Sequence, residues 1–290
     1  MSMPTITQSL LIPIQVKANN RIPVFVIPGA GGNVFGFMEL VESLNLPNSI
    51  YGLQPRGLDG ITPPHKSVIE AAEHYLKEIN NLRLRSPIHL LGHSFGGWVA
   101  LELGFRLLKT GRRIESLIIV DSDLPNEDET PPIFDDTIVF MKYVEVLEQM
   151  TEASWGILDG DVRSLNRSDR LELLHKKMIH FKLIPGRSRP DVLKGPTTVF
   201  AACLSTLYAP TFVYPYPAYL ILMDEKAMDL EANKRRQQKL IAGWSKITTN
   251  LVYWHSPGNH MSALKSPHVH LVADWMRNIF SDAQVPQITK

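Results

Sequence analysis

Residues 88–97 of this 290-residue chain read IHLLGHSFGG and carry its strongest structural signal. Residues 88–91 are mostly apolar and typical of a buried strand, and the residues from about Gly97 to Leu108 have helical apolar spacing. Between them lies Gly-x-Ser-x-Gly, whose Ser94 stands at a sharp turn from strand to helix. Such a turn strains the backbone, so Gly92 and Gly96 must carry no side chain. The stretch predicts a serine nucleophile.

Further apolar runs extend this unit into a sheet. Strands are expected at 24–27, 88–91, 117–120, 219–222 and 251–253. Helices are expected at about 68–82, 97–108 and 268–280, the first with Ile69, Ala72, Leu76 and Ile79 on one face. Strands that alternate with helices predict an α/β fold with a mostly parallel sheet. With the serine turn, this is the α/β-hydrolase fold.

Residues 125–217 interrupt the alternation with helical patterns bounded by prolines. We interpret them as a helical lid inserted into a core of residues 1–124 and 218–290. An insertion at this place would cover the carboxyl ends of the strands, where α/β sheets bind ligands. The alternative is a separate helical domain with no part in catalysis.

A serine hydroxyl needs a neighbouring base, and histidine has the matched pKa. In this fold the base follows the last strand and precedes the last helix, a position that His260 fills. His93 adjoins the nucleophile and is expected to fill space beside the turn. His268 and His270 have metal-like spacing but lack a third ligand, so no metal site is expected.

Two positions supply a carboxylate that could orient His260. Asp121 follows strand 117–120, and Asp224 follows strand 219–222. Both preserve the chain order Ser, Asp, His. The residue pattern leaves this choice open.

The glycine-rich segment PGAGGN, residues 28–33, follows the first core strand. Its backbone N–H groups are placed to stabilise an oxyanion, with the Phe95 N–H as a second donor. A dinucleotide-binding loop is the alternative, but the third glycine is out of place and no acidic ribose partner is evident.

Composition excludes several classes of function. Thirty basic and 29 acidic residues give a net charge of +1, so nucleic acid is not expected as the main partner. The single cysteine forms no internal disulfide. No apolar run approaches the ~18 residues of a membrane span, and no secretory leader is evident. We expect a soluble cytoplasmic protein without membrane contact.

Three motifs in order carry a family resemblance. They are IPGAGGNV at 27–34, YGLQPRG at 51–57 and GHSFGG at 92–97. Together they resemble the thioesterase domains that end non-ribosomal peptide and polyketide synthases. The likeness covers about 11–120 and 219–280, whereas the lid is recognisable only by its position.

The resemblance implies that an acyl or peptidyl chain passes from the phosphopantetheine of a carrier protein to Ser94. The chain then passes to water or to a nucleophile of its own, with no cofactor of the enzyme. The resemblance also favours Asp121 as the acid and Ala30 as the first oxyanion donor, with Gly29 as an alternative. A discrete editing thioesterase would favour Asp224.

A general carboxylesterase or lipase of the same fold is the competing function, and a non-catalytic relative is a third. The complete set of Ser94, Asp121 and His260 argues against the third. Whether the chain, which begins at Met1, is free-standing or part of a larger protein is left open.

Overall fold

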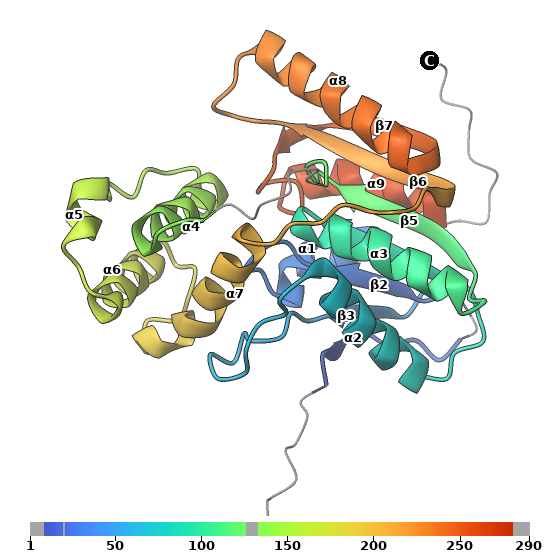
Figure 1. Ribbon diagram of the computed structural model, residues 1–290, viewed down its shortest axis with the longest axis horizontal. Coiled ribbons are helices and arrows are strands. Elements are labelled where there is room, and N and C mark those ends of the chain that lie inside the picture. Colours follow the sequence, from blue (N-terminus) through green and yellow to red (C-terminus); the bar gives the residue numbers. More distant parts are fainter. Residues whose placement is uncertain (1–8, 20, 126–132, 281–290) are drawn as a thin grey trace, which may run out of the picture.

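The computed structural model describes residues 9–19, 21–125 and 133–280 (Figure 1). Within these ranges, seven strands form one sheet in the order β1-β3-β2-β4-β5-β6-β7. All neighbouring pairs are parallel except β1 and β3. The strands are β1 (Leu11–Gln15), β2 (Val24–Ile27), β3 (Ile50–Leu53), β4 (Ile88–His93), β5 (Ile114–Val120), β6 (Tyr214–Asp224) and β7 (Thr248–Asn259). The predicted α/β class is confirmed.

Helices cover both faces of the sheet (Figure 1). One face packs against α1 (Met38–Leu44) and α9 (His268–Phe280), and the other against α2 (Val68–Asn81), α3 (Phe95–Lys109) and α8 (Leu230–Ile247). Strand residues alternate between these layers: Leu117 and Ile119 face α3, whereas Ile118 and Val120 face α9. Burial on both faces explains the unbroken apolar runs of the central strands.

Helix α2 corrects one detail of the sequence prediction. Ile69, which the apolar spacing placed on the buried face, is 46% exposed. The buried line instead runs through Val68, Ala72, Tyr75 and Ile79. These positions follow the i, i+4, i+7, i+11 spacing of a helix face, so the period was right. Of the four predicted residues, Ala72 and Ile79 are buried, Leu76 is half-buried against the core, and Ile69 is exposed.

Between β5 and β6 the chain forms a helical insertion, here residues 133–213. It contains α4 (Asp136–Thr151), α5 (Asp159–Arg163), α6 (Arg167–His180), the 3₁₀ turn η2 (Pro190–Leu193) and α7 (Lys194–Leu204). Its own apolar cluster includes Tyr143, Trp155, Leu174 and Phe200. Figure 1 shows α4–α6 beside the sheet domain, with α7 between them and the sheet.

The edges of the insertion differ from the predicted lid. Strand β6 begins at Tyr214, so Pro215 and Pro217 lie within the strand. Tyr208 falls within the predicted lid range of 125–217 but packs in the sheet core, where its hydroxyl donates to Glu102 Oε2 at 2.9 Å. Pro131 and Pro132, two prolines near the predicted first edge at residue 125, lie outside the described residues.

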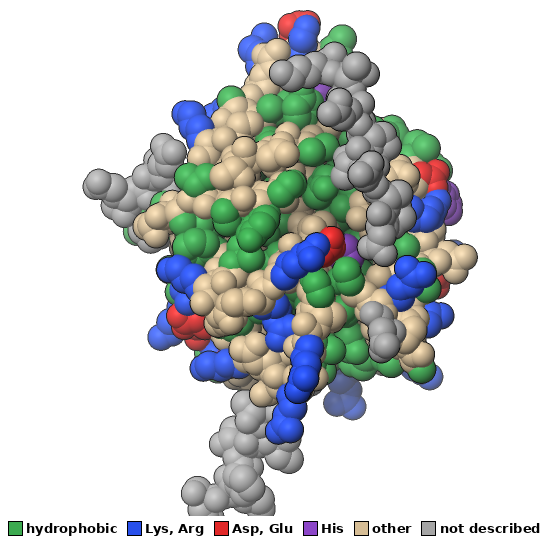
Figure 2. All heavy atoms as spheres, turned by 90° about the vertical axis from the view of Figure 1, so that its right-hand side faces the viewer, with side chains coloured by type: hydrophobic (Ala, Val, Ile, Leu, Met, Phe, Trp, Pro, Cys, Tyr) green, Lys and Arg blue, Asp and Glu red, His purple; other side chains and the backbone are tan. Residues whose placement is uncertain are grey.

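The surface mixes charge with apolar side chains. On the face seen in Figure 2, Lys and Arg side chains are scattered among apolar ones rather than joined into one basic area. None of the helices in the described ranges combines the length and apolar character that crossing a membrane requires.

Candidate active site

The turn between β4 and α3 forces Ser94 into an unusual backbone conformation, with φ 54° and ψ −128°. A Cβ on Gly92 would collide with the Gly96 carbonyl, and one on Gly96 would collide with the Ile27 carbonyl. Both glycines are therefore required by the close approach of backbone segments. The predicted turn is present, and α3 begins at Phe95, directly after the serine.

Three hydrogen bonds fix this turn to its surroundings. The Ser94 N–H donates to the Val120 carbonyl at 2.9 Å, at the end of the neighbouring strand β5. The Ser94 carbonyl accepts from the Ser122 hydroxyl at 2.6 Å and from the Gly97 N–H at 2.8 Å. The strained conformation is thus over-determined, as expected for strain stored at a functional position.

His260 lies against Ser94, with 3.0 Å between Nε2 and the serine Oγ. It directly follows β7 in a turn organised by Asn259, whose side-chain oxygen accepts from the N–H groups of Met261 and Ser262, both at 3.0 Å. The structure therefore places Ser94 beside His260, the one of the ten histidines that the sequence analysis selected as the base.

Asp121 is the carboxylate that contacts this histidine. Its Oδ2 lies 2.8 Å from His260 Nδ1, and its side chain is fully buried. With a proton on Nδ1, the imidazole donates to Asp121 and leaves Nε2 to accept from the serine hydroxyl. Asp121, like Ser94, has a positive φ, here 42°.

Asp224, the alternative acid, lies apart from this contact. Its side chain is exposed, and its Oδ1 accepts from Gln237 Nε2 at 2.8 Å. The residue pattern left both carboxylates open and the family resemblance favoured Asp121, which the structure places beside His260.

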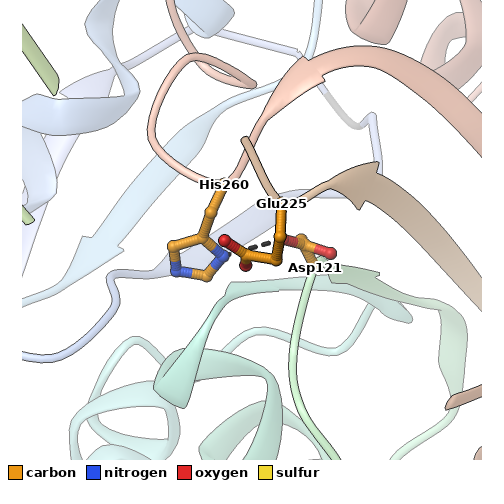
Figure 3. A group of neighbouring side chains, drawn as sticks. All are labelled: Asp121, Glu225 and His260. Carbon is orange, nitrogen blue, oxygen red and sulfur yellow. Dashed lines mark hydrogen bonds and ion pairs between the residues drawn. The ribbon is translucent and has the colours of Figure 1, made fainter. Parts of the chain in front are cut away.

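Arg236, Asp123 and Glu225 are further charged residues around the acid. Arg236 from α8 lies 3.5 Å from Asp121 Oδ1, 3.4 Å from Asp123 and 3.7 Å from Glu225. Figure 3 shows Glu225 beside the pair of Asp121 and His260. Sequence reasoning assigned no role to Glu225 or to Arg236.

His93 also does more than fill space. Its Nε2 donates to the His260 carbonyl at 3.0 Å, and the two rings lie 5.0 Å apart. Burial, helped by the nearby His260, lowers the pKa of His93 to about 4. His93 is therefore neutral at pH 7, with one ring N–H that holds the backbone of the histidine loop.

Electrostatics favour a charged pair of Asp121 and His260. Burial alone would raise the pKa of Asp121, but the hydrogen bond and charge of His260, together with Arg236, hold that pKa below its usual range. Burial alone would lower the pKa of His260. This effect of burial is outweighed by the hydrogen bond to Asp121 and by the negative charges of Asp121, Glu225 and Asp123. The pKa of His260 is therefore raised above 6.5.

The loop after β2 lies against the nucleophile. A Cβ on Gly29 would approach the Ser94 Cβ to 3.0 Å. On its other side the loop meets the insertion, because Ala30 packs on the insertion's apolar cluster and Gly31 contacts Phe200. Phe95, at the start of α3, is among the first four residues, whose N–H groups lack a partner within the helix. These positions suit the two predicted oxyanion donors.

A cation is the other occupant that this cluster could bind. Asp121, Glu225 and His260 offer ligand atoms within 4.8 Å of one another. However, Asp121 Oδ2 and His260 Nδ1 already share a hydrogen bond, which a metal would have to replace. The geometry fits a histidine oriented by a carboxylate better than a metal centre.

Comparison with known proteins shows which sequences resemble this chain. Residues 22–155 match the family model described as "Thioesterase domain". Malpibaldin synthetase of Mortierella alpina is 38% identical over 39% of this chain, and a non-reducing polyketide synthase of Pseudevernia furfuracea is 26% identical over 88%. The chain spans only 2% and 12% of the length of these relatives.

Solved structures agree on the fold. A four-domain nonribosomal peptide synthetase in its holo form aligns with a TM-score of 0.79 and 21% identity, covering 95% of this chain and 20% of that one. The Vlm2 thioesterase domain aligns with a TM-score of 0.64 and 22% identity, covering 92% and 95%. The chain thus has the α/β-hydrolase fold of these solved thioesterase domains, and over residues 22–155 its sequence is similar to the thioesterase domain family.

Proposed function

We propose that this chain is a serine thioesterase that releases an acyl or peptidyl chain from the phosphopantetheine thioester of a carrier protein. The observation that carries the proposal is the continuous contact from Ser94 Oγ through the His260 ring to Asp121, at 3.0 and 2.8 Å. This arrangement converts a weakly nucleophilic hydroxyl into a nucleophile at neutral pH.

In the first half-reaction Ser94 Oγ attacks the thioester carbonyl carbon and gives its proton to His260 Nε2. The carbonyl oxygen becomes negative, and the N–H groups of Phe95 and Ala30 are the proposed donors that stabilise it. The C–S bond then breaks, and the departing sulfur takes the proton from His260. The product is an ester on Ser94 and a free pantetheine thiol.

In the second half-reaction His260 takes a proton from the attacking nucleophile. This nucleophile is water, which gives hydrolysis, or a hydroxyl or amine of the bound chain, which gives cyclisation. The tetrahedral intermediate collapses, and His260 returns the proton to Ser94 Oγ. Asp121 stabilises the imidazolium in both halves and stays ionised throughout.

The charges around Asp121 support this role. Arg236 forms an ion pair with Asp121 Oδ1, and the N–H of Met223 donates to the same oxygen at 3.2 Å. Oδ2 is left to orient His260. A fully buried carboxylate needs such partners to remain charged.

The carrier protein enters the proposal through the relatives, which are synthetases much longer than this chain. The reaction above uses only side chains and backbone N–H groups, so we propose no cofactor beyond the phosphopantetheine of the partner. The competing function, a general carboxylesterase or lipase, would use the same three residues on an oxygen ester.

Matched substrates separate these functions. We expect kcat/KM for an acyl-pantetheine thioester to exceed that for the matched oxygen ester by about tenfold or more, equivalent to ~1.4 kcal/mol of transition-state stabilisation. The Ser94→Ala variant is the control for background hydrolysis. Preference for the ester would contradict the proposal and favour the esterase.

A further inference from the structure

Gly97, the last glycine of the GHSFGG motif, is required for a different reason from the other two. A Cβ on Gly92 or Gly96 would collide with backbone carbonyls, whereas a Cβ on Gly97 would collide first with the Oγ atom of Ser122. Glycine at position 97 therefore makes room for one particular hydroxyl. That hydroxyl belongs to the residue directly after Asp121.

The Ser122 hydroxyl contacts the peptide bond that joins Ser94 to Phe95. Ser122 is fully buried, and its hydroxyl donates to the Ser94 carbonyl at 2.6 Å. The same carbonyl accepts from the Gly97 N–H at 2.8 Å. In a planar trans peptide the C=O and N–H groups point in opposite directions. The N–H of this peptide, which is the proposed oxyanion donor of Phe95, therefore points away from Ser122.

Two tryptophans anchor the backbone around Ser122. The indole N–H of Trp244 in α8 donates to the Ser122 carbonyl at 3.2 Å. The indole N–H of Trp98 in α3 donates to the next carbonyl, that of Asp123, at 2.8 Å. Both tryptophans are buried. Ser122 therefore presents its hydroxyl from a backbone that packing and hydrogen bonds hold in place.

We propose that Ser122 is a positioning residue for the oxyanion donor: its hydroxyl fixes the Ser94–Phe95 peptide so that the Phe95 N–H points at the negative oxygen of the tetrahedral intermediate. The inference rests on the proposed function and adds a residue to its mechanism. A preorganised donor stabilises the developing charge without reorienting during the reaction. Because Ser122 directly follows Asp121, one short segment orients both the acid and the oxyanion donor.

The first experiment compares the kinetics of Ser122→Ala with the wild type on an acyl-pantetheine thioester. Both half-reactions pass through an oxyanion, so kcat should fall whichever half limits the rate. We expect a fall of about 10- to 30-fold, smaller than the loss of about 10²–10³-fold for outright removal of an oxyanion donor. KM should stay within about twofold, because the Ser122 hydroxyl stabilises only the transition state.

Two further variants control this comparison. Ser122→Thr retains a hydroxyl and should recover most of kcat. Ser116→Ala is the matched control, since Ser116 is also buried and its Oγ lies 2.8 Å from His89 Nδ1, a contact outside the active site. It should keep kcat within about twofold of the wild type. An unchanged kcat in a folded Ser122→Ala variant overturns the proposal.

The competing explanation is that Ser122→Ala displaces Asp121, and the pH profile separates the two. The contact with Asp121 raises the pKa of His260. Displacement of Asp121 would therefore move the acid limb of kcat/KM to lower pH, whereas a change confined to the oxyanion donor leaves its midpoint unchanged. A loss of kcat accompanied by a downward shift of this limb overturns the proposal.

The second experiment observes the oxyanion without turnover, by using an alkyl trifluoromethyl ketone. Ser94 Oγ adds to the ketone carbon, His260 takes the serine proton, and the carbonyl oxygen becomes a hemiketal oxyanion. With ¹³C at the ketone carbon, NMR follows the protonation of this oxygen as the pH is lowered. In Ser122→Ala we expect the pKa of the hemiketal hydroxyl to rise, equivalent to about tenfold weaker stabilisation of the oxyanion. An unchanged pKa overturns the proposal.

The ketone also makes the two proposals fail separately, because a serine esterase forms the same hemiketal. Preference for the oxygen ester, with a raised hemiketal pKa in Ser122→Ala, rejects the thioesterase and retains the role of Ser122. Thioester turnover with an unchanged hemiketal pKa rejects the role of Ser122 alone.

A thermal melt checks that each variant folds. If Ser122→Ala does not fold, Ser122→Cys replaces it, because a thiol is similar in size to the hydroxyl but is a weaker donor. It should lower kcat about three- to tenfold and raise the hemiketal pKa in the same direction. Wild-type values of both quantities in Ser122→Cys overturn the proposal.

Discussion

The carboxyl ends of the central strands, here called the sheet edge, and the helical insertion both contain non-glycine residues with positive φ, but for different reasons. At the sheet edge these residues are Ser94 and Asp121, whose side chains meet at His260. In the insertion they are Glu152 and Lys182, which end α4 and α6. A left-handed residue after a helix is an ordinary way to stop it. Backbone strain at Ser94 and Asp121, which buried hydrogen bonds maintain, instead marks a functional position.

The difference implies that the two regions have different functions. Substitutions at the sheet edge should change the rate of the chemical steps, whereas those in the insertion should change which substrate is accepted.

The largest effect is expected for Ser94→Ala. Turnover should fall by at least about a thousandfold, because the nucleophile is gone, while the melting temperature stays close to that of the wild type. Steady-state kinetics with an acyl-pantetheine thioester and a thermal melt check both points. Ser205→Ala, at the end of α7, is the control that should retain activity. Residual turnover above about one part in a hundred would remove Ser94 from its assigned role.

Asp121→Asn should follow closely, with a loss on the order of a thousandfold or more. An amide cannot stabilise the imidazolium and favours the wrong tautomer of His260. Asp224→Asn is the matched control and should cost less than about threefold, since Asp224 contacts Gln237 instead. If Asp224→Asn were the more damaging change, the acid would belong to β6 and not to β5.

His93→Ala should lower kcat by about 10- to 100-fold, corresponding to ~1.4–2.8 kcal/mol for a lost buried hydrogen bond and its packing. His93 acts as a positioning residue through the His260 carbonyl, so KM should stay unchanged. His93→Gln keeps an N–H donor and should recover most of the activity. Equal losses in the Ala and Gln variants would show that ring packing, and not this hydrogen bond, matters.

The pH dependence tests the electrostatics of the same cluster. His260 must be neutral to accept the serine proton, and its pKa is raised, so activity should be lost as pH falls through a midpoint above 6.5. Glu225→Gln removes one of the charges that raise this pKa and should move the midpoint downward. Glu231→Gln, an exposed change in the first turn of α8, should not move it. The acid limb of kcat/KM measures the shift, and a midpoint below 6.5 in the wild type would reject this account.

The sequence alone predicted the parts of this molecule that depend on local chemistry. Gly92 and Gly96 identified the turn, because close backbone approach admits no other residue there. Double-sided burial left continuous apolar runs in β2, β4 and β5. Strands β1 and β3 were not predicted as strands. Both are short, and Pro13 and Gly52 are residues that local propensity disfavours in strands.

What the sequence could not decide depends on contacts between distant segments. The choice between Asp121 and Asp224 turned on which strand end faces His260, which the residue pattern does not encode. Arg236 lies 115 residues from Asp121 in the chain and carries no motif, so only the packing of α8 reveals it. The exposure of Ile69 likewise depends on how α2 is rotated against the sheet.

The smallest expected effect concerns the insertion, which we predict to act as a lid over the acyl chain. Its apolar cluster is separate from the two clusters of the sheet domain, which it adjoins where Phe200 lies beside the loop at Gly31. A segment with its own core can open without unfolding the sheet, so residues 133–213 should exchange amide hydrogens faster than β4 and β5.

An acyl-pantetheine mimic trapped on Ser94 adds contacts only in the closed arrangement. It should therefore slow exchange in α4 and α7 by a few fold and leave β4 unchanged. Hydrogen exchange followed by mass spectrometry resolves these segments, and the unmodified Ser94→Ala variant treated with the same mimic controls for non-covalent binding. If acylation protects the loops after β2 and β3 while 133–213 exchange as before, the insertion is structural. Substrate choice would then lie with the sheet edge alone, and the division between the two regions would fail.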